Sequence, residues 1–426
     1  MNGWSGRLRR FRRAYEAYPA TAICLTIAVA LFVAVRVEQT VQGLSAEDAL
    51  WHCGAVTQLA VQGEPELKGL LDLWDGQVAR IGASAFHHAN WLHLALNALA
   101  IGFLGTLLEA RMGSAAYAAF LGASVFVSFL PELLLEHMAV GLSGVAYAQF
   151  GALLVLRRSD ARLTRLVSDR VIQAGLGWLV LCFLLTWWGV LMVANWAHVA
   201  GLAYGWLVGR IFLQQPATRK SVRLAVLAGH GLILVGVYFV THPVWLGRYH
   251  WYLGNQEADW ARRMQHWRTA LKYDPGLTGL WRTMALAEAQ KGDLLAAWRT
   301  VLEGIRLNRS DEKGCRLAQF LWHQMRSPVE RREARRLLAR IFGAEQDRWK
   351  RRLGLLTSSQ SSIAADGQRI LPPWVVIRFG QPPPPWLEDS RWRELLEDSL
   401  LGLTPRRTLP PVNPDAPHSA GEGIRL

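Results

Sequence analysis

Two stretches of sequence decide the fold: GLSGVAY at residues 141–147 and NWAHVAGLAYG at residues 195–205. Each belongs to an apolar run long enough to enter a bilayer. The first carries a hydroxyl group, on Ser143, and the second carries an imidazole, on His198. Reactive and ionisable side chains are costly inside a membrane, so they are functional candidates there and usually face a water-filled cavity. Together they indicate serine-protease chemistry within a membrane.

The composition indicates a membrane part followed by a soluble part. The chain has 426 residues, of which 51% are hydrophobic, and its apolar character lies almost entirely before residue 245. A net charge of +14 would favour nucleic acid as a partner in a soluble protein. Here much of the Lys and Arg lies between apolar segments, so orientation in a bilayer explains the charge better and no nucleic acid is expected. The four cysteines show no CxxC spacing and predict neither a disulfide framework nor a zinc site.

Seven membrane spans are predicted, which makes the first part an all-α, polytopic helix bundle with six core helices and a seventh. Several are near the ~20 residues that a crossing helix needs. The predicted spans are 19–36, 90–109, 115–130, 142–156, 171–190, 192–213 and 223–241. The fourth is short, because it is bounded by Arg157 and Arg158 and preceded by PELLLEH, read as a turn containing Pro131. A helix of about 21 Å stops part-way through the bilayer, and Ser143 would lie submerged but within reach of water.

The distribution of basic residues predicts the orientation. The N-terminal stretch and the segments after the fourth and sixth spans are rich in Arg, whereas the alternate loops carry few basic residues. The N-terminus, residues 1–18, is therefore expected in the cytoplasm, and seven crossings put everything after residue 245 outside. The alternative for the first span is a cleaved signal peptide, since RLRRFRR before an apolar stretch also fits that pattern.

Acyl transfer needs a nucleophile, a base and donors for the developing oxyanion. His93 and Asn97 are four residues apart and share one face of the second span, with His88 just upstream. Taken alone, Ser143 would more often be a helix cap or a close-packing site, and His198 a satisfied interior histidine. No intramembrane carboxylate stands near His198 in sequence, so a Ser/His dyad is implied.

Small residues support contact between the fourth and sixth spans. Gly201, Gly205 and Gly209 recur every four residues after His198, a spacing that lets helix backbones approach closely. Such an approach would bring His198 to Ser143. A dimerisation face on the sixth span is the alternative.

These residues together resemble the rhomboid family of intramembrane serine proteases, over about residues 76–213. The GxSG motif is matched by Gly141, Leu142, Ser143 and Gly144, followed by Tyr147. The AHxxG motif is matched by Ala197, His198 and Gly201, with Gly205 continuing the pattern. The HxxxN pair is matched by His93 and Asn97, with His88 at the upstream position, and LLEARMGS resembles the family's following turn through Glu109, Arg111 and Gly113.

The resemblance implies roles for these residues. Ser143 would be the nucleophile and His198 the general base, with His93, Asn97 and the Ser143 N–H as oxyanion donors and Tyr147 stacked on the base. It implies transmembrane helices of membrane proteins as substrates, entering laterally near spans two and five, and neither a metal nor an organic cofactor. One departure is that Ala79, not Trp, precedes Arg80 in the first outer loop. Trp74 or Trp91 is the candidate for the interfacial anchor.

The rest of the chain has a different pattern. Within residues 250–350 the turn at Tyr273 and Asp274 recurs at Leu307 and Asn308, a 34-residue interval that looks like tetratricopeptide repeats and predicts a groove for a peptide or protein ligand. A plain helical hairpin domain that caps the protease is the alternative. Residues 356–426 are rich in Ser, Gly and Pro and predict a mostly disordered tail, in which SRWRELLEDSLLGL could form an amphipathic helix.

The leading interpretation is a multi-pass intramembrane serine protease, expected in a bacterial inner membrane. One competitor is a proteolytically inactive, rhomboid-like chaperone or adaptor, although such relatives typically lose the Ser or the His. Another is a metal-dependent membrane enzyme or transporter with His87, His88, His93 and His198 as ligands. The predicted topology also puts Cys53 and Cys315 on one side of the membrane, which permits a disulfide bond between them.

Overall fold

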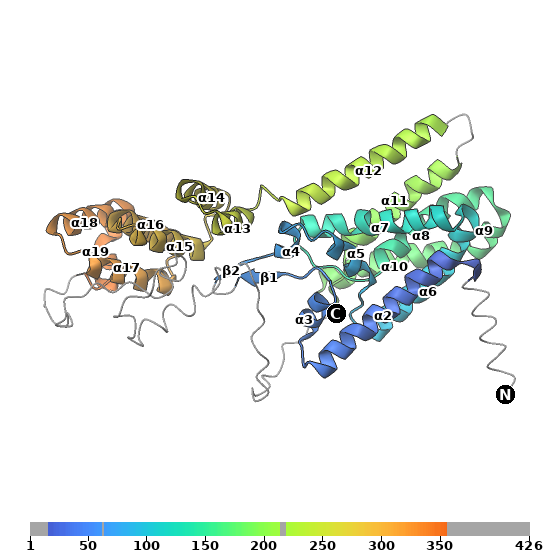
Figure 1. The fold of residues 1–426 in the computed structure, drawn as a ribbon, viewed down its shortest axis with the longest axis horizontal. Coiled ribbons are helices and arrows are strands. Elements are labelled where there is room, and N and C mark those ends of the chain that lie inside the picture. Colours follow the sequence, from blue (N-terminus) through green and yellow to red (C-terminus); the bar gives the residue numbers. More distant parts are fainter. Residues whose placement is uncertain (1–15, 62–63, 214–218, 356–426) are drawn as a thin grey trace. The chain divides into compact units, whose positions relative to one another are not determined.

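The computed structural model describes residues 16–61, 64–213 and 219–355, and these fall into two compact units. The first, here called the membrane unit, comprises residues 16–58 and 70–243 of the described chain. The second, here called the helical unit, comprises residues 59–69 together with 244–355. Figure 1 shows the elements of both. Residues 1–15 of the predicted cytoplasmic N-terminus and the whole of the predicted tail, 356–426, lie outside the described residues.

The helices are the only regular secondary structure among the described residues of the membrane unit. Its long helices are α2 (Pro19–Val41), α6 (Trp91–Met112), α7 (Ser114–Leu134), α8 (Ser143–Leu156), α10 (Asp169–Trp187), α11 (Asn195–Leu213) and α12 (Arg219–Thr241). Short elements connect them: α3 (Ala46–His52), α4 (Leu71–Trp74), α5 (Ala79–Phe86), η1 (Arg157–Ser159) and α9 (Ala161–Leu166). Each of the seven predicted spans corresponds to one long helix. Together with the helical unit they confirm the all-α fold class.

Four of the described helices, α2, α6, α7 and α10, are long and apolar enough to cross a membrane. Part of α12, Gly231–Thr241, is a shorter apolar helix. α8 has only 14 residues, in agreement with the predicted short fourth span. These apolar helices support a multi-pass membrane protein.

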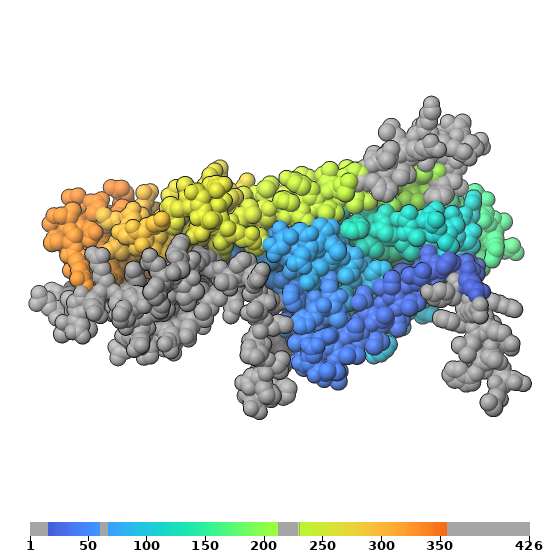
Figure 2. Space-filling view, viewed as in Figure 1, coloured from blue at the N-terminus to red at the C-terminus, as the bar shows by residue number. Residues whose placement is uncertain are grey.

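The short helix α8 forms the centre of the membrane unit. It is apolar on all sides, and nearly all of its residues are buried, as expected for a helix surrounded by others. It packs against α11, α7 and α6. By contrast α2, dark blue in the space-filling view, lies on the surface of the unit (Figure 2). Ser143, the first residue of α8, is therefore placed within the bundle.

The predicted turn before α8 begins later than expected, because Pro131 lies inside α7, which continues to Leu134. Pro131 has no N–H and so removes one helical hydrogen bond, yet α7 continues for three residues beyond it. The segment between α7 and α8 therefore consists of residues 135–142 alone.

The helical unit contains α13 (Gly247–Gln256), α14 (Trp260–Tyr273), α15 (Thr278–Gln290), α16 (Leu294–Leu307), α17 (Glu312–Gln324), α18 (Pro328–Phe342), η3 (Gly343–Glu345) and α19 (Gln346–Arg352). Asp259, Asp293, Asp311 and Ser327 cap α14, α16, α17 and α18 by accepting a backbone N–H. The starts of α14 and α16 are 34 residues apart, as are those of α15 and α17. The tetratricopeptide identity and its ligand stay predictions.

The helical unit also includes a β-hairpin that no pattern in the sequence predicted. Strand β1 (Leu59–Val61) pairs antiparallel with β2 (Glu64–Gly69), and these are the only strands among the described residues. The hairpin lies in the segment between α2 and α6, yet β2 packs against α13 and α15. Leu67 is completely buried there, and Arg248 donates a hydrogen bond to the Lys68 carbonyl oxygen at 2.9 Å. The first loop thus contributes directly to the helical unit.

Candidate active site

Ser143 and His198 meet in the membrane unit. Ser143 begins α8, His198 lies in the first turn of α11, and His198 Nε2 lies 2.8 Å from Ser143 Oγ, within hydrogen-bond range. His198 is only 3% exposed. Its Nδ1 is buried without a hydrogen-bond partner among the described residues, and no carboxylate contacts it there. The arrangement is a dyad in which Nε2 can accept the hydroxyl proton when Nδ1 carries the other ring proton.

Glycines allow the two helices to approach this closely. A Cβ atom at Gly201 would collide with the carbonyl oxygen of Gly144, and one at Gly205 with that of Ala148. A Cβ atom at Gly144 would lie 3.2 Å from the Ala197 carbonyl oxygen and 2.6 Å from Ser128 Cβ. The backbones of α8 and α11 are therefore in direct contact. The glycine pattern therefore serves the contact between α8 and α11, which is the first of its two interpretations.

Tyr147 lies against the imidazole, as the resemblance implied. Its ring centroid is 4.7 Å from that of His198, with an interplanar angle of 33°. The Tyr147 hydroxyl donates a hydrogen bond to the Gly175 carbonyl oxygen of α10 at 3.0 Å. The Tyr147 side chain is thus fixed by the contact of its ring with His198 and by the hydrogen bond of its hydroxyl, and it limits the rotation of the His198 imidazole.

His93 and Asn97 lie beside the turn that leads to Ser143. Gly141 adopts φ +110°, which favours glycine, and a Cβ atom there would lie 2.8 Å from His93 Nε2 and 3.5 Å from Asn97 Nδ2. Asn97 Nδ2 donates to the His93 carbonyl oxygen at 3.1 Å, which leaves its second N–H available. The His88 ring lies 5.0 Å from the His93 ring, edge to face, and so supports it from behind.

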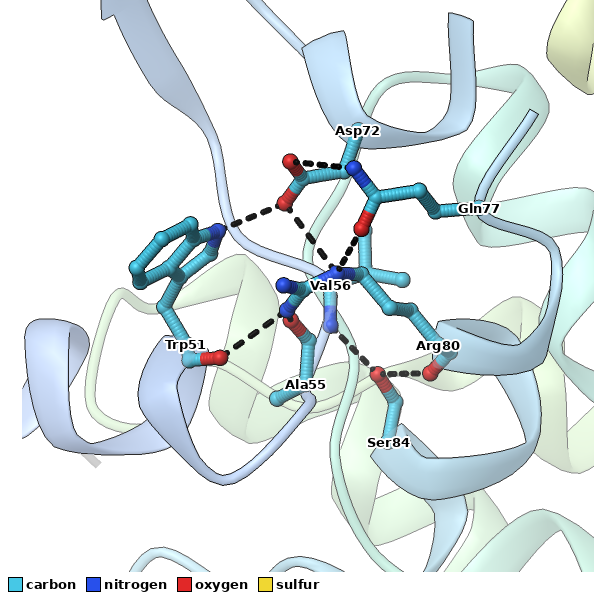
Figure 3. Close-up of polar contacts among 7 residues, drawn as sticks. All are labelled: Trp51, Ala55, Val56, Asp72, Gln77, Arg80 and Ser84. Atoms are coloured by element: carbon cyan, nitrogen blue, oxygen red, sulfur yellow. Dashed lines mark hydrogen bonds and ion pairs between the residues drawn. The ribbon is translucent and has the colours of Figure 1, made fainter. Parts of the chain in front are cut away.

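A polar network among residues of the segment between α2 and α6 is connected to this turn, and Figure 3 shows the network. Arg80 donates to the carbonyl oxygens of Trp51 and Ala55 at 2.9 and 3.0 Å. Ser84 Oγ donates to the Arg80 carbonyl oxygen and accepts the Val56 N–H. The Ser84 carbonyl oxygen in turn accepts the Gly141 N–H at 3.2 Å. The network therefore connects the first loop to the residue two positions before Ser143.

The tryptophan partner of Arg80 was missed from the sequence. The Arg80 guanidinium lies over the Trp51 ring at 5.0 Å, and Trp51 Nε1 donates to Asp72 at 2.6 Å. Trp74, one of the two expected interfacial anchors, is buried at 8% exposure, whereas Trp91 is 64% exposed. Trp51 stands 29 residues before Arg80, so no local signal joined them.

The dyad opens into a cavity of about 1960 Å³ inside the membrane unit. Ser143, His198, His93 and Asn97 line it. Its walls include α6 and α10, and α10 is the least buried of the four apolar spans, at 6%. Among the described residues no group of three or more His, Cys, Asp or Glu could hold a metal ion. All four cysteines are free, Cys53 and Cys315 included.

The chain is similar in sequence to known proteins over the segment that carries these residues. Residues 75–215 match the Rhomboid domain. Rhomboid protease GlpG of Klebsiella pneumoniae subsp. pneumoniae is 28% identical over 201 residues, which cover 45% of this chain and 62% of that protein. Rhomboid protease GlpG of Salmonella paratyphi A is 28% identical over 200 residues, with the same coverage. The chain thus spans 62% of the length of these curated relatives. The similarities support the rhomboid family, and the matched segment contains the dyad, the His93 and Asn97 pair and Tyr147.

Proposed function

We propose that this chain is an intramembrane serine protease of the rhomboid type, which hydrolyses peptide bonds within or beside the transmembrane helix of a membrane protein. The observation that carries the proposal is the 2.8 Å separation between Ser143 Oγ and His198 Nε2 at the wall of a cavity. A serine and an imidazole at this distance, on different helices, are the parts that acyl transfer needs.

The mechanism follows from these two side chains. Ser143 Oγ attacks the scissile carbonyl carbon while its proton passes to His198 Nε2. The resulting imidazolium then protonates the leaving amine, which gives an acyl-enzyme on Ser143. Water, activated by the neutral imidazole, hydrolyses this ester and regenerates the serine. The Tyr147 ring keeps the imidazole oriented during both proton transfers.

His93, Asn97 and the Ser143 backbone N–H are the proposed donors to the oxyanion. Ser143 begins α8, so its N–H is one of those that a helix leaves without an internal partner, and the helix dipole favours negative charge there. The contact of Gly141 with the side chains of His93 and Asn97 supports their convergence on the same point.

A substrate helix is proposed to enter the cavity laterally, between α6 and α10. Both helices line the cavity that contains the dyad. Two of the lining residues on α10, Trp178 and Phe183, are large exposed side chains. Because α10 is little buried, its displacement would cost few contacts within the unit.

A proteolytically inactive membrane chaperone is less well supported, because it has no need for a hydrogen-bonded Ser and His. The test replaces each separately. Ser143→Ala and His198→Ala should each abolish cleavage of a model transmembrane substrate by purified, folded protein, because members of a dyad act as a unit. Ser159→Ala, an exposed serine of η1, is the matched control and should cleave at the wild-type rate. Wild-type turnover by either dyad variant would disprove the assignment.

We further propose that the helical unit is extracytoplasmic, in a bacterial inner membrane. The Arg-rich segment at η1 and α9 favours the cytoplasm for the end of α8, and seven crossings lead to the outside. The hairpin adds independent support. Residues 59–69 lie between α2 and α6 and pack with α13 and α15, so the first loop and the helical unit must share one side.

Thiol labelling tests this topology. Ser310→Cys places an exposed thiol in the helical unit, and Ser159→Cys places one in the Arg-rich segment after α8. A membrane-impermeant maleimide applied to spheroplasts should label the first and should reach the second only after lysis. The reverse pattern would invert the topology, and labelling of both sites only after lysis would put the helical unit in the cytoplasm.

A further inference from the structure

Glu132 is a buried carboxylate in the last turn of α7 that the mechanism above does not use. It is 3% exposed, although charged side chains are costly in a membrane helix and are retained where they have partners. Its Oε1 accepts the backbone N–H of Trp196 at 2.8 Å and that of Ala197 at 3.3 Å. These are the two residues directly before His198.

The bonds to Glu132 complete the start of α11. The first N–H groups of a helix have no partner within it. Here the His198 N–H donates to the Ala194 carbonyl oxygen at 3.3 Å and the Asn195 N–H to that of Val193 at 2.9 Å. Trp196 and Ala197 lie between these and donate to Glu132 instead. A negative charge at a helix N-terminus is favoured by the helix dipole as well, so the carboxylate holds the first turn of α11 against α7.

The other carboxylate oxygen of Glu132 contacts the segment that leads to Ser143. Glu132 Oε2 lies 3.1 Å from His137 Nδ1, and the Glu132 carbonyl oxygen accepts the His137 N–H at 2.9 Å. His137 lies in the segment 135–142, which leads through Gly141 to Ser143. One residue therefore contacts both the segment before the serine and the turn that carries the histidine.

We propose that Glu132 is a positioning residue, which fixes the separation of Ser143 and His198 by joining the segment before α8 to the first turn of α11. The expected effect of Glu132 on turnover rests on the proposed function, whereas its expected effect on the distance between residues 143 and 198 does not. Glu132 does not touch the reacting atoms. It acts through Trp196, Ala197 and His137, and loss of its carboxylate frees the start of α11 to move relative to α8.

The chain offers a matched control in Glu109, a second buried carboxylate that caps a helix. Glu109 accepts the N–H groups of Ala20 and Thr21, each at 2.9 Å, and the Thr21 hydroxyl at 2.8 Å, all at the start of α2. It is 2% exposed, against 3% for Glu132, so the two carboxylates are buried to a similar extent. Its own helix, α6, carries His93 and Asn97 near the opposite end, and neither α6 nor α2 carries Ser143 or His198. Removal of Glu109 therefore reports what the loss of a buried helix cap does to the fold alone.

The first measurement separates kcat from KM for a model transmembrane substrate. Glu132→Ala should lower kcat by about 10²-fold, the usual result of a displacement of about 1 Å between reacting groups, with KM little changed. Glu132→Gln retains an acceptor oxygen for α11 and should stay within about tenfold of wild type. Glu109→Ala should lose thermal stability but keep its kcat per folded molecule. Wild-type kcat in folded Glu132→Ala, or an equal loss in Glu109→Ala, would overturn the proposal.

The second measurement does not depend on activity. In Ser143→Cys/His198→Cys protein, dibromobimane becomes fluorescent when it bridges the two thiols, and mass spectrometry identifies the bridged peptides. Adding Glu132→Ala should lower the bridging yield severalfold, whereas adding Glu109→Ala should leave it unchanged. If Glu132→Ala does not fold, Glu132→Leu takes its place, because it fills the site without an acceptor oxygen, and wild-type values of both its bridging yield and its kcat would refute the role. Inactivity of the wild-type protein would count against the proposed function only, since the bridging yield still tests Glu132.

Discussion

The membrane unit and the helical unit hold their helices together in opposite ways. Between α8 and α11 the backbones touch, because glycines occupy the contact and leave no room even for a Cβ atom. In the helical unit, large rings fill the space between helices, and Trp251, Trp267 and Trp298 are fully buried on α13, α14 and α16. Lipid is as apolar as a side chain, so helices in a membrane gain little from apolar burial and associate through close packing. In water that burial is the main stabilising term.

Because of this difference, substitutions should change mainly the distances between reacting atoms in the membrane unit and mainly the free energy of unfolding in the helical unit. A site built on backbone contact has its distances set by the smallest residues, so adding one methyl group there displaces the reacting atoms. A core of large rings has its free energy set by the buried area, so the removal of one ring costs stability without moving a distant site.

Among changes to helix packing, the largest effect on cleavage is expected at Gly205. Gly205→Ala puts a methyl group against the Ala148 carbonyl oxygen, which separates α11 from α8 and withdraws His198 from Ser143. Cleavage should fall by at least about 10²-fold in folded protein. Gly122→Ala in α7 is the control, because a Cβ atom there meets nothing within 4 Å. Rates that are equal for the two variants would show that the α8 and α11 contact does not set the dyad distance.

Substitution of the two proposed oxyanion donors that lie on α6 measures how much of the catalysis depends on residues other than those of the contact between α8 and α11. His93→Ala combined with Asn97→Ala should lower kcat by about 10² to 10³-fold, because the Ser143 N–H remains as the only donor. Each single change should cost less, since the donors share the charge. Rates measured on a model transmembrane substrate that stay unchanged in the double variant would remove both residues from the site.

The opposite result is expected in the helical unit. Trp298→Ala removes a fully buried ring and its hydrogen bond to the Ala334 carbonyl oxygen, and should cost about 3 to 5 kcal/mol. Labelling of Cys315, buried in the same core, measures this opening in the full chain. Leu307→Ala, at a 45% exposed position, should cost less than about 0.5 kcal/mol. The rate at which a short model helix is cleaved should change in neither variant. A large loss of cleavage in Trp298→Ala would show that the stability of the helical unit and the geometry of the active site are not independent.

The smallest effect is a pH dependence confined to the helical unit. Burial raises the pKa of the Glu288 carboxyl above its ordinary value of 4.5, while the hydrogen bond from Thr300 opposes this. The folded state therefore favours the protonated acid, so its contribution to stability is full below pH 4.5 and is lost as the pH rises through the folded pKa. Glu288→Gln should remove this slope. Cys315 labelling by a pyridyl disulfide, compared between the two proteins at each pH, would show parallel profiles if Glu288 does not contribute.

The sequence alone determined the features that depend on local patterns. An apolar run bounded by Arg157 and Arg158 predicted the short α8, and a four-residue glycine spacing predicted its contact with α11. Spacings within one helix, such as that of His93 and Asn97, predicted shared faces. The motifs matched by Ser143, His198 and Tyr147 implied that these residues meet. All of this follows because helix periodicity and span length are written in consecutive residues.

Only the tertiary structure decided which distant residues share a contact. Trp51 meets Arg80, Glu132 meets the start of α11, and the six-residue strand β2 of the first loop packs against helices far along the chain. None has a periodic signature, because a single hydrogen bond between separate elements leaves no pattern in either one. The start of the turn was predicted too early for a related reason: a proline weakens a helix without fixing the residue at which it ends, and α7 continues to Leu134.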